Sequence, residues 1–294
     1  MLDLPEPQAG PGEVRIRVHA AAVNPTDTLT RAGAKKLTAP PPHVPGMDAA
    51  GVIDQVGPDV GDRLTPGQRV VALVVPNGSH GAYAEQIVVP ATSVVPAPAG
   101  VDLPAASTLL MNAMTARLAL DSLALSPDDT LAVTGAAGAF GGYVVQLARA
   151  DGLRVIADAK PADRDLVQGF GADHVVDRGD DVVTRIREIA PDGVAGLADG
   201  ALLNERAIPA IADGGRLATV RGWDGPAERG IKVHPVMVPR GANDTTGLDR
   251  LARQAEDGVV SVRVAQVFPA EQAPEAHRRL EAGGVRGRLV LDFS

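Results

Sequence analysis

The glycine-rich segment after Leu131–Thr134 is the stretch whose residue types and spacing most directly indicate chemistry. An apolar run ends at Thr134, the next eight residues read Gly-Ala-Ala-Gly-Ala-Phe-Gly-Gly, and a helical pattern covers Gly141–Ala150. Glycine lets a backbone approach a diphosphate closely, and the free N–H groups at the start of a helix attract its negative charge. The segment therefore predicts a dinucleotide site whose diphosphate lies against Gly138, Ala139, Phe140 and Gly141.

The match of this segment to the G-x-G-x-x-G fingerprint is incomplete. Gly138 and Gly141 have the spacing of its last two glycines, and Ala136 stands at the first. Such a turn can also be no more than a tight connection between a strand and a helix. The next strand pattern, Arg154–Ala157, follows at the distance expected of a βαβ unit, and Asp158 at its end is placed to bond the adenosine ribose.

Charged residues near Asp158 bear on which nicotinamide cofactor is bound. A carboxylate at Asp158 repels a 2′-phosphate and favours NAD, whereas Lys160 could bind that phosphate together with Arg164 or Arg178. The same charges could equally be solvated in loops. On balance the residues favour NADP (NADPH) slightly over NAD.

The first hundred residues read as strands separated by turns. Glu13–Ala22 alternates between apolar and polar residues, the period of a half-buried strand. Further strands are expected at Ala50–Val56, Arg69–Val75 and Ala84–Val89, and no helical pattern of normal length precedes Leu103. This half therefore resembles a compact β-barrel-like domain.

From Pro104 onward, helical and strand patterns alternate, which predicts a parallel α/β sheet. After Gly241 the pattern changes again. A helix, a strand-like run, a second helix and a terminal strand are expected there. The expected helices and strands of this half are Pro104–Leu123, Leu131–Thr134, Gly141–Ala150, Arg154–Ala157, Arg164–Gly169, His174–Val176, Val182–Ile189, Ala195–Ala198, Asn204–Ala212, Arg216–Val220, Leu248–Glu256, Val259–Val267, Ala273–Ala282 and Arg288–Phe293.

Composition narrows the classes of protein to consider. The chain has 294 residues, of which 45% are hydrophobic, and a net charge of −8, so it is long enough for two domains and is expected to bind no nucleic acid. It has no cysteine, which excludes disulfides, thiol nucleophiles and cysteine-ligated zinc. The six histidines are scattered singly and are interpreted as structural, and His277 is placed on a surface helix. No signal peptide or membrane-spanning stretch is recognised, so the protein is expected to be cytoplasmic.

Ordered motifs along nearly the whole chain resemble one known family, the zinc-independent quinone oxidoreductase branch of the medium-chain dehydrogenase/reductase superfamily. The motifs that carry the resemblance are Val23–Asp27, Arg31, Gly33, Val44–Val52, Val56-Gly57, Gly67–Val70, Gly81–Glu85, Thr115-Ala116, Gly135–Gly141, Gly171–Asp173, Gly214–Arg216 and Gly287–Leu291.

The resemblance implies an α/β fold in which a GroES-like β-rich catalytic domain carries an inserted Rossmann domain with a doubly wound parallel sheet. The expected division is 1–106 and 243–294 for the catalytic domain and 107–242 for the Rossmann domain. A homodimer is implied as well.

The resemblance also implies a reaction, hydride transfer from NADPH to a quinone or an α,β-unsaturated carbonyl compound. Asn24 and Thr115 would lie near the nicotinamide, although they could instead serve turn capping and helix packing. Zinc-dependent relatives have a Cys in the loop written here Val23-Asn24-Pro25 and a His-Glu pair in place of Met47-Asp48, so no zinc is expected. Without such a Lewis acid, alcohol oxidation is disfavoured.

One departure from the superfamily concerns the proton donor. Enoyl reductases place a Tyr a few residues after the Asn-Pro motif, where this chain has Thr28–Ala32 without a Tyr. Asp27 or His80 could replace it, and Asp27 could equally order the loop as a hydrogen-bond acceptor. The missing donor leaves an alternative open, a non-redox biosynthetic cyclase or a cofactor-sensing module on the same fold.

Overall fold

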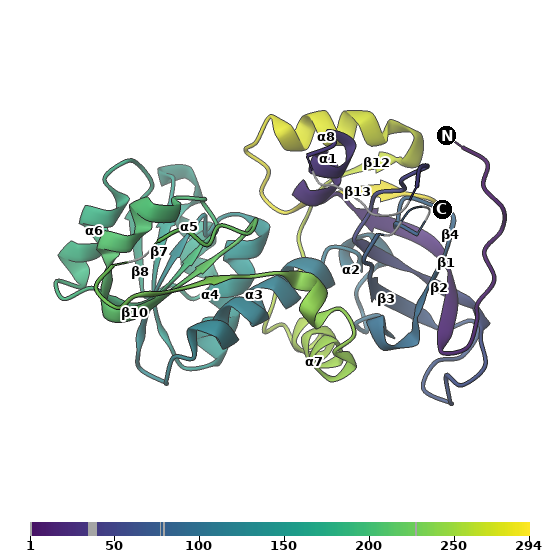
Figure 1. Ribbon diagram of the computed structural model, residues 1–294, viewed down its shortest axis with the longest axis horizontal. Coiled ribbons are helices and arrows are strands. Elements are labelled where there is room, and N and C mark those ends of the chain that lie inside the picture. The colour runs from purple at the N-terminus through teal and green to yellow at the C-terminus, as the bar shows by residue number, and fades with distance from the viewer. Residues whose placement is uncertain (1, 35–39, 77, 79, 227) are drawn as a thin grey trace. The chain divides into compact units, whose positions relative to one another are not determined.

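The computed structural model describes residues 2–34, 40–76, 78, 80–226 and 228–294 (Figure 1). Contacts along the chain define two compact units. The first comprises Met1–Met111 and Pro239–Ser294, and the second comprises Asn112–Val238. The division expected from the sequence lies a few residues away, after residues 106 and 242.

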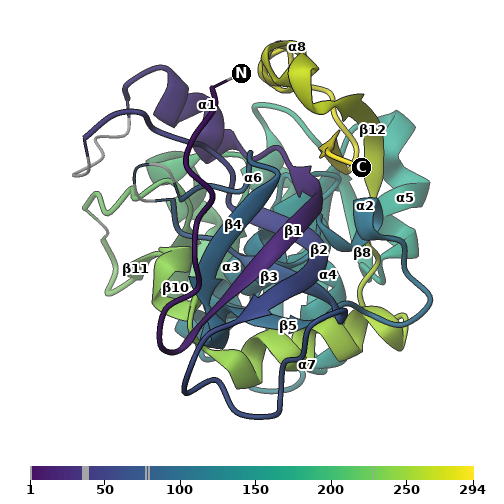
Figure 2. The ribbon, with the colours of Figure 1, turned by 90° about the vertical axis from the view of Figure 1, so that its right-hand side faces the viewer.

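The first unit is built on a sheet in the order β12-β13-β1-β2-β3-β5, with β4 paired to β1 (Figure 2). Its strands are β1 (Glu13–Ala22), β2 (Asp48–Val56), β3 (Arg69–Leu73), β4 (Gln86–Pro90), β5 (Val94–Pro96), β12 (Val264–Pro269) and β13 (Arg288–Asp292). All pairs are antiparallel except β12 and β13. The register sets Ala22, at the end of β1, opposite Asp48 on one side and Val290 on the other, which joins segments far apart in sequence.

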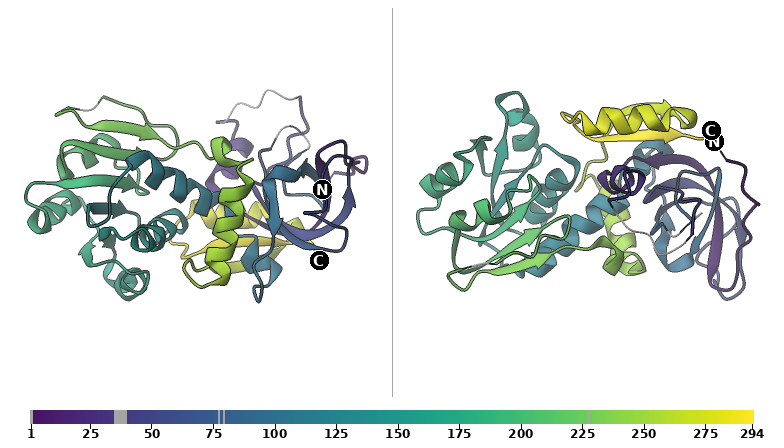
Figure 3. Two further views of the ribbon diagram at one scale, coloured as in Figure 1. Left: turned by 90° about the horizontal axis from the view of Figure 1, so that it is seen from below. Right: turned by 45° about the horizontal axis from the view of Figure 1, so that its top comes forward.

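Among its described residues, the first unit has the helices α1 (Pro25–Arg31), α2 (Leu103–Ala106), α7 (Thr245–Glu256) and α8 (Ala273–Glu281). The helix α7 packs beside β5, and α8 lies along β12 and β13 and also contacts α1 (Figure 3). Proline is tolerated at the start of α1 because the first N–H of a helix has no partner within it. Short 3₁₀ turns occur at Ala91–Ser93, Val238–Gly241 and Ala270–Gln272.

The second unit contains a six-stranded sheet in which every pair is parallel (teal to green in Figure 1). Its strands are β6 (Thr130–Thr134), β7 (Arg154–Ala159), β8 (His174–Asp177), β9 (Val194–Asp199), β10 (Ile211–Thr219) and β11 (Lys232–Pro235). The order β8-β7-β6-β9-β10-β11 is the strand order 3-2-1-4-5-6 of the Rossmann fold. The order reverses at β6, so the crevice expected to hold a ligand lies beyond the carboxyl end of that strand.

The helix α3 (Leu110–Leu123) leads into the first strand, β6. Helices α4 (Ala139–Ala150), α5 (Arg164–Gly169) and α6 (Val182–Ile189) connect successive parallel strands, with 3₁₀ turns at Pro161–Asp163 and Asn204–Ala210. Side chains of α6 and the second of these turns form an apolar core with one face of the sheet, including Ile156, Leu197 and Leu217. The helix α4 contacts β6, β7 and β9. No helix among the described residues is long and apolar enough to cross a membrane.

The expected α/β fold class is confirmed, and most expected elements occur within a few residues of their predicted bounds. Two local expectations were wrong. The run Val259–Val267 is a strand only from Val264, and Asn204–Ala212 is a 3₁₀ turn that gives way to β10 at Ile211. The helix α1 precedes Leu103 but has only seven residues, and His277 lies on α8 with its side chain buried.

Candidate functional site

The glycine-rich turn joins β6 to α4 at the carboxyl edge of the second unit's sheet. Gly135 has φ +69°, a conformation that favours glycine, and its carbonyl accepts the N–H of Gly138 at 2.9 Å. Gly138 is the residue before the first turn of α4. The N–H groups of Ala139, Phe140 and Gly141 belong to that first turn, where a helix supplies no carbonyl partners, so this end of α4 can bind an anion.

Close backbone approach explains which positions of the turn must be glycine. A Cβ on Gly141 would lie 2.4 Å from the carbonyl oxygen of Gly135, and a Cβ on Gly135 would lie 2.8 Å from the carbonyl carbon of Gly200. Ala136, at the first position of the fingerprint, is buried and has no positive φ. The position that requires a positive φ is therefore Gly135, one residue earlier, and alanine is tolerated at 136 because its φ is not positive.

Two buried carboxylates hold the turns at this edge. The register sets Thr134 of β6 opposite Asp199 of β9. On the other side of β6, Val133 pairs with Ala157, so Asp158 of β7 lies beside Thr134. Asp199 accepts hydrogen bonds from the Thr134 hydroxyl at 2.6 Å and from the N–H of Asn204 at 2.8 Å. Asp158 accepts the N–H groups of Gly135 at 2.6 Å and Ala136 at 3.1 Å. Burial raises the pKa of Asp158, while these bonds and Arg178 oppose the shift.

The cationic residues predicted to read a 2′-phosphate differ in how they are engaged. Lys160 is exposed directly after β7, and Arg178 follows β8 with its side chain 45% exposed and its Nε 3.9 Å from Asp158 Oδ2. Arg164 instead donates to the Val175 carbonyl and to Asp177 Oδ1, both at 2.6 Å. Lys160 and Arg178 are thus the better placed of the three for an added anion.

A buried polar cluster lies in the first unit, where helix α1 begins. Asp27 is 1% exposed, and its carboxylate accepts the N–H of Asn24 at 2.8 Å, the N–H of Gly46 at 2.9 Å and the Tyr83 hydroxyl at 3.2 Å. Burial raises its pKa, while the bonds from Asn24, Gly46 and Tyr83 and the charge of Arg288 act in the opposite direction. Asp27 in this structure orders the loop, as the sequence allowed.

Asn24 and Asp48 continue the cluster toward β13. The Asn24 amide donates to Asp48 Oδ2 at 2.9 Å and to the Ala22 carbonyl at 3.2 Å, and Asp48 Oδ1 accepts the N–H of Met111 at 2.8 Å. Burial raises the pKa of Asp48 to about 6, although the charge of buried Arg288 lowers it. Both N–H groups of the Asn24 amide are therefore engaged within the protein.

Tyr83 links this cluster to α8. Its hydroxyl lies 3.2 Å from His277 Nε2 as well as contacting Asp27, and the two rings are 5.7 Å apart between centroids. His277 is buried, and desolvation lowers its pKa. The sequence places Tyr83, Gly46 and Arg288 in motifs that carry the resemblance but assigns them no role in a site. Their common site exists only once β13 and α8 have joined the N-terminal strands.

The residues at the zinc positions of the superfamily do not fit zinc. Met47 is buried, and Asn24 and Asp48 are bonded to each other. A borderline-soft ion such as zinc is held by Cys, His or carboxylate groups converging at about 2.0–2.3 Å, and a thioether beside an engaged amide does not supply that set. Within the described ranges, no group of three or more His, Cys, Asp or Glu is arranged to hold a metal ion.

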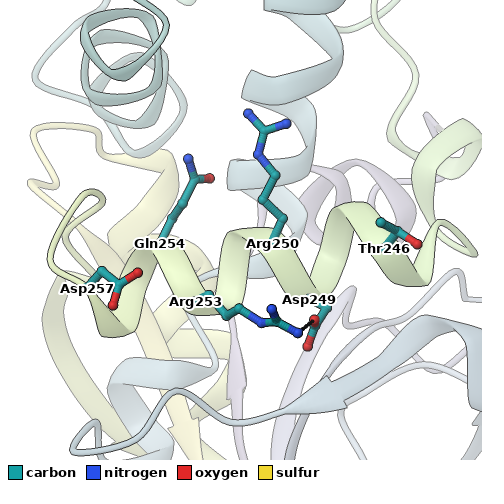
Figure 4. Close-up of a pocket in the computed structure, with 6 residues that line it drawn as sticks. All are labelled: Thr246, Asp249, Arg250, Arg253, Gln254 and Asp257. Carbon is teal, nitrogen blue, oxygen red and sulfur yellow. Dashed lines mark hydrogen bonds and ion pairs between the residues drawn. The ribbon is translucent and has the colours of Figure 1, made fainter.

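A surface hollow of about 370 Å³ runs along α7 (Figure 4). The side chains of Arg253 and Asp249 form an ion pair within it, and Arg250 and Gln254 extend from the helix in a different direction. The hollow includes neither the glycine-rich turn nor the buried polar cluster. It is open to solvent and lined mainly by charged and amide residues, and it therefore differs from the enclosed pockets that bind small molecules.

The predicted site residues thus fall in two places. Gly138, Ala139, Phe140, Gly141, Asp158, Lys160 and Arg178 lie at the carboxyl edge of the second unit's sheet, where the Phe140 ring packs on Gly200. Thr115 is half-buried on α3 in the same unit. Asn24 and Asp27 lie in the buried cluster of the first unit.

Two family models match the chain. Residues 10–99 match the alcohol dehydrogenase GroES-like domain, and residues 170–291 match the zinc-binding dehydrogenase domain. The first model falls on the strands of the first unit. The second begins inside the parallel sheet and runs on into β13, so both units are covered in part.

Several relatives align with the chain. The synaptic vesicle membrane protein VAT-1 homolog of Mus musculus is 34% identical over 191 residues, 64% of this chain and 46% of that protein. The chain spans about half the length of this relative and of its rat and human counterparts. A 2-haloacrylate reductase of Burkholderia sp is 29% identical over 96% of this chain and 91% of that protein. The quinone oxidoreductase of Sus scrofa is 28% identical over 95% and 88%, respectively.

Solved structures align with nearly the whole chain. An NAD-dependent alcohol dehydrogenase is 31% identical, with a TM-score of 0.88 over 100% of this chain and 95% of that chain. A mycobacterial protein complexed with NADPH is 28% identical, with a TM-score of 0.86 over 99% and 94%. The similarity therefore extends to proteins described with either nicotinamide cofactor.

Proposed function

Because the chain belongs to the medium-chain dehydrogenase/reductase superfamily, we propose that it is an NADPH-dependent reductase that acts without zinc on a quinone or an α,β-unsaturated carbonyl compound. The observation that carries the proposal is the turn at Gly135–Gly141, whose glycines pack backbone against backbone and which leads directly into the first N–H groups of α4. The bound nicotinamide supplies the hydride. The turn binds and orients the cofactor, and the buried carboxylates of Asp158 and Asp199 hold the turns at this edge in place.

The class of hydride acceptor is proposed from the absence of a suitable proton donor among the candidate site residues. Reducing a quinone requires orientation and a proton that water can supply to oxygen, whereas reducing a simple alkene requires a proton delivered to carbon. Asp27 is buried and engaged as an acceptor, so it is a poor proton donor to a substrate. A quinone is thus favoured over an enoyl thioester. The relatives from pig and Burkholderia are a quinone oxidoreductase and a 2-haloacrylate reductase, which belong to the same class of reductases.

The reaction itself is tested by following NADPH oxidation with a panel of small quinones and enones. We expect one NADPH to be oxidised for each quinone reduced. We also expect the rate to be unchanged after exhaustive treatment of the protein with a metal chelator. A protein that binds NADPH and turns over no member of the panel would overturn the proposal. Product formation that consumes no NADPH would favour the cyclase alternative.

Preference for NADPH is proposed from the exposed cations Lys160 and Arg178. Replacing Lys160 by alanine should weaken NADPH binding by about 2 kcal/mol, roughly 30-fold, because a charge-assisted bond to the 2′-phosphate is lost. NADH binding should be unchanged, as measured by calorimetric titration. The matched control is Lys232→Ala, another exposed lysine of the same unit, which lies at the start of β11 and thus at the opposite end of the parallel strands.

Two further properties are proposed with the activity, a homodimer and a cytoplasmic location. Light scattering of the purified protein at the concentration of the kinetic assay tests the first of them. A monomeric mass with full activity would show that the site needs no second copy.

A further inference from the structure

Asp158 is turned into the protein rather than toward a ligand. Its side chain is 2% exposed at the carboxyl end of β7. One oxygen, Oδ1, accepts two N–H groups of the glycine-rich turn, from Gly135 at 2.6 Å and from Ala136 at 3.1 Å. These bonds tie the turn to the strand next to the one it follows.

The other oxygen of Asp158 is directed toward Arg178. The separation of 3.9 Å from Nε to Oδ2 is that of an ion pair rather than a hydrogen bond, and the Arg178 side chain is 45% exposed. The backbone N–H of Arg178 donates to the Ala159 carbonyl at 2.8 Å, which fixes the backbone of Arg178 beside the end of β7. The charge of Asp158 is thus balanced by Arg178 on one side and by the turn on the other.

A ribose hydroxyl needs an accessible acceptor, and Asp158 offers almost no exposed surface. To receive that hydroxyl on Oδ1, the carboxylate would have to give up bonds to Gly135 and Ala136, and an unpaired buried N–H is costly. The bonds already present also spread the negative charge that would otherwise repel a 2′-phosphate.

We propose that Asp158 is a positioning residue, which holds the glycine-rich turn in its phosphate-binding shape and does not select between NADPH and NADH. The selection falls to Lys160 and Arg178. The inference rests on the proposed function in one respect, that this turn binds a nicotinamide dinucleotide.

Two substitutions separate this role from that of a ribose ligand. Asp158→Asn retains an oxygen that can accept both N–H groups but removes the charge, and Asp158→Ala removes the acceptor. If Asp158 holds the turn, Asp158→Asn should bind NADPH and NADH within about threefold of the wild type. Asp158→Ala should lose affinity for both by the same factor, roughly tenfold, with their ratio unchanged. If it binds ribose, both variants should gain NADPH affinity and lose NADH affinity, which would overturn the proposal.

A second measurement does not depend on any cofactor. Amide hydrogen exchange at Gly135 and Ala136 in the protein alone should accelerate at least tenfold in Asp158→Ala and remain slow in Asp158→Asn. Unchanged exchange in Asp158→Ala would overturn the proposal even if dinucleotides bind. The control Asp177→Asn removes a carboxylate from the end of β8, where it pairs with Arg164, and should leave exchange in the turn unaltered.

The two measurements also keep the proposals distinguishable. If the wild type binds neither NADPH nor NADH, the proposed function fails, while the exchange data still decide whether Asp158 holds the turn. If Asp158→Ala does not fold, the cofactor ratio of Asp158→Asn decides the matter, because only a ribose ligand predicts that the ratio shifts toward NADPH.

Discussion

Replacing Gly141 by alanine is expected to lower the affinity for NADPH and for NADH by roughly 100-fold, about 3 kcal/mol. The added Cβ would lie 2.4 Å from the Gly135 carbonyl oxygen and 2.7 Å from the Ala136 Cα. Both are backbone atoms of the turn, so no flexible side chain can move aside. The turn itself must shift, and the N–H groups at the start of α4 then lose their alignment with the diphosphate.

The matched control for this substitution is Gly169→Ala in α5. Gly169 is also helical, has no positive φ and has no atom within 4 Å of an added Cβ. Alanine there should leave cofactor binding unchanged and stabilise the fold by about 0.5–1 kcal/mol. Calorimetric titration with each cofactor and urea unfolding of both variants measure the difference. Wild-type affinity in the Gly141→Ala protein would show that the diphosphate does not lie against this turn.

The dinucleotide turn was predictable from the sequence because its determinants are local. A buried strand, a glycine turn and a helix follow one another within about twenty residues, and each has its own pattern. The position of Asp158 beside this turn was also predictable from its distance after Gly138. Its orientation was not, because the carboxylate bonds to N–H groups 22 and 23 positions earlier in the chain.

The polar cluster of the first unit shows where prediction from the sequence ends. Asn24 and Asp27 were recognised, but their neighbours are supplied by Tyr83, His277 and Arg288, which are up to 264 positions away. The sequence placed His277 on a surface helix, but the burial of its side chain could not be predicted while its partner was unknown. His277 is buried because Tyr83 gives it a polar contact inside the unit, and no pattern within α8 encodes that contact.

The same cluster makes the stability of the chain depend on pH, and the contribution of Asp48 can be isolated by substitution. Burial raises the pKa of Asp48 from its ordinary value of 3.8 to about 6. Between these values the unfolded chain has lost the proton and the folded chain still holds it. The contribution of Asp48 to stability is therefore complete below about pH 4 and is lost as the pH rises through 6, by about 3 kcal/mol in all.

Asp48→Asn abolishes this titration, so its stability relative to the wild type should rise with pH. Between about pH 4.5 and pH 7, the free energy of unfolding of the wild type should fall by about 2 kcal/mol relative to the variant, as measured by urea unfolding. Asp27 also titrates with a raised pKa but is common to both proteins. Asp54→Asn removes the same charge from the surface of the same strand and measures how much of the slope follows from net charge alone. A constant difference between wild type and Asp48→Asn across this range would mean that Asp48 is already ionised in the folded protein at pH 4.5, with Arg288 outweighing its burial.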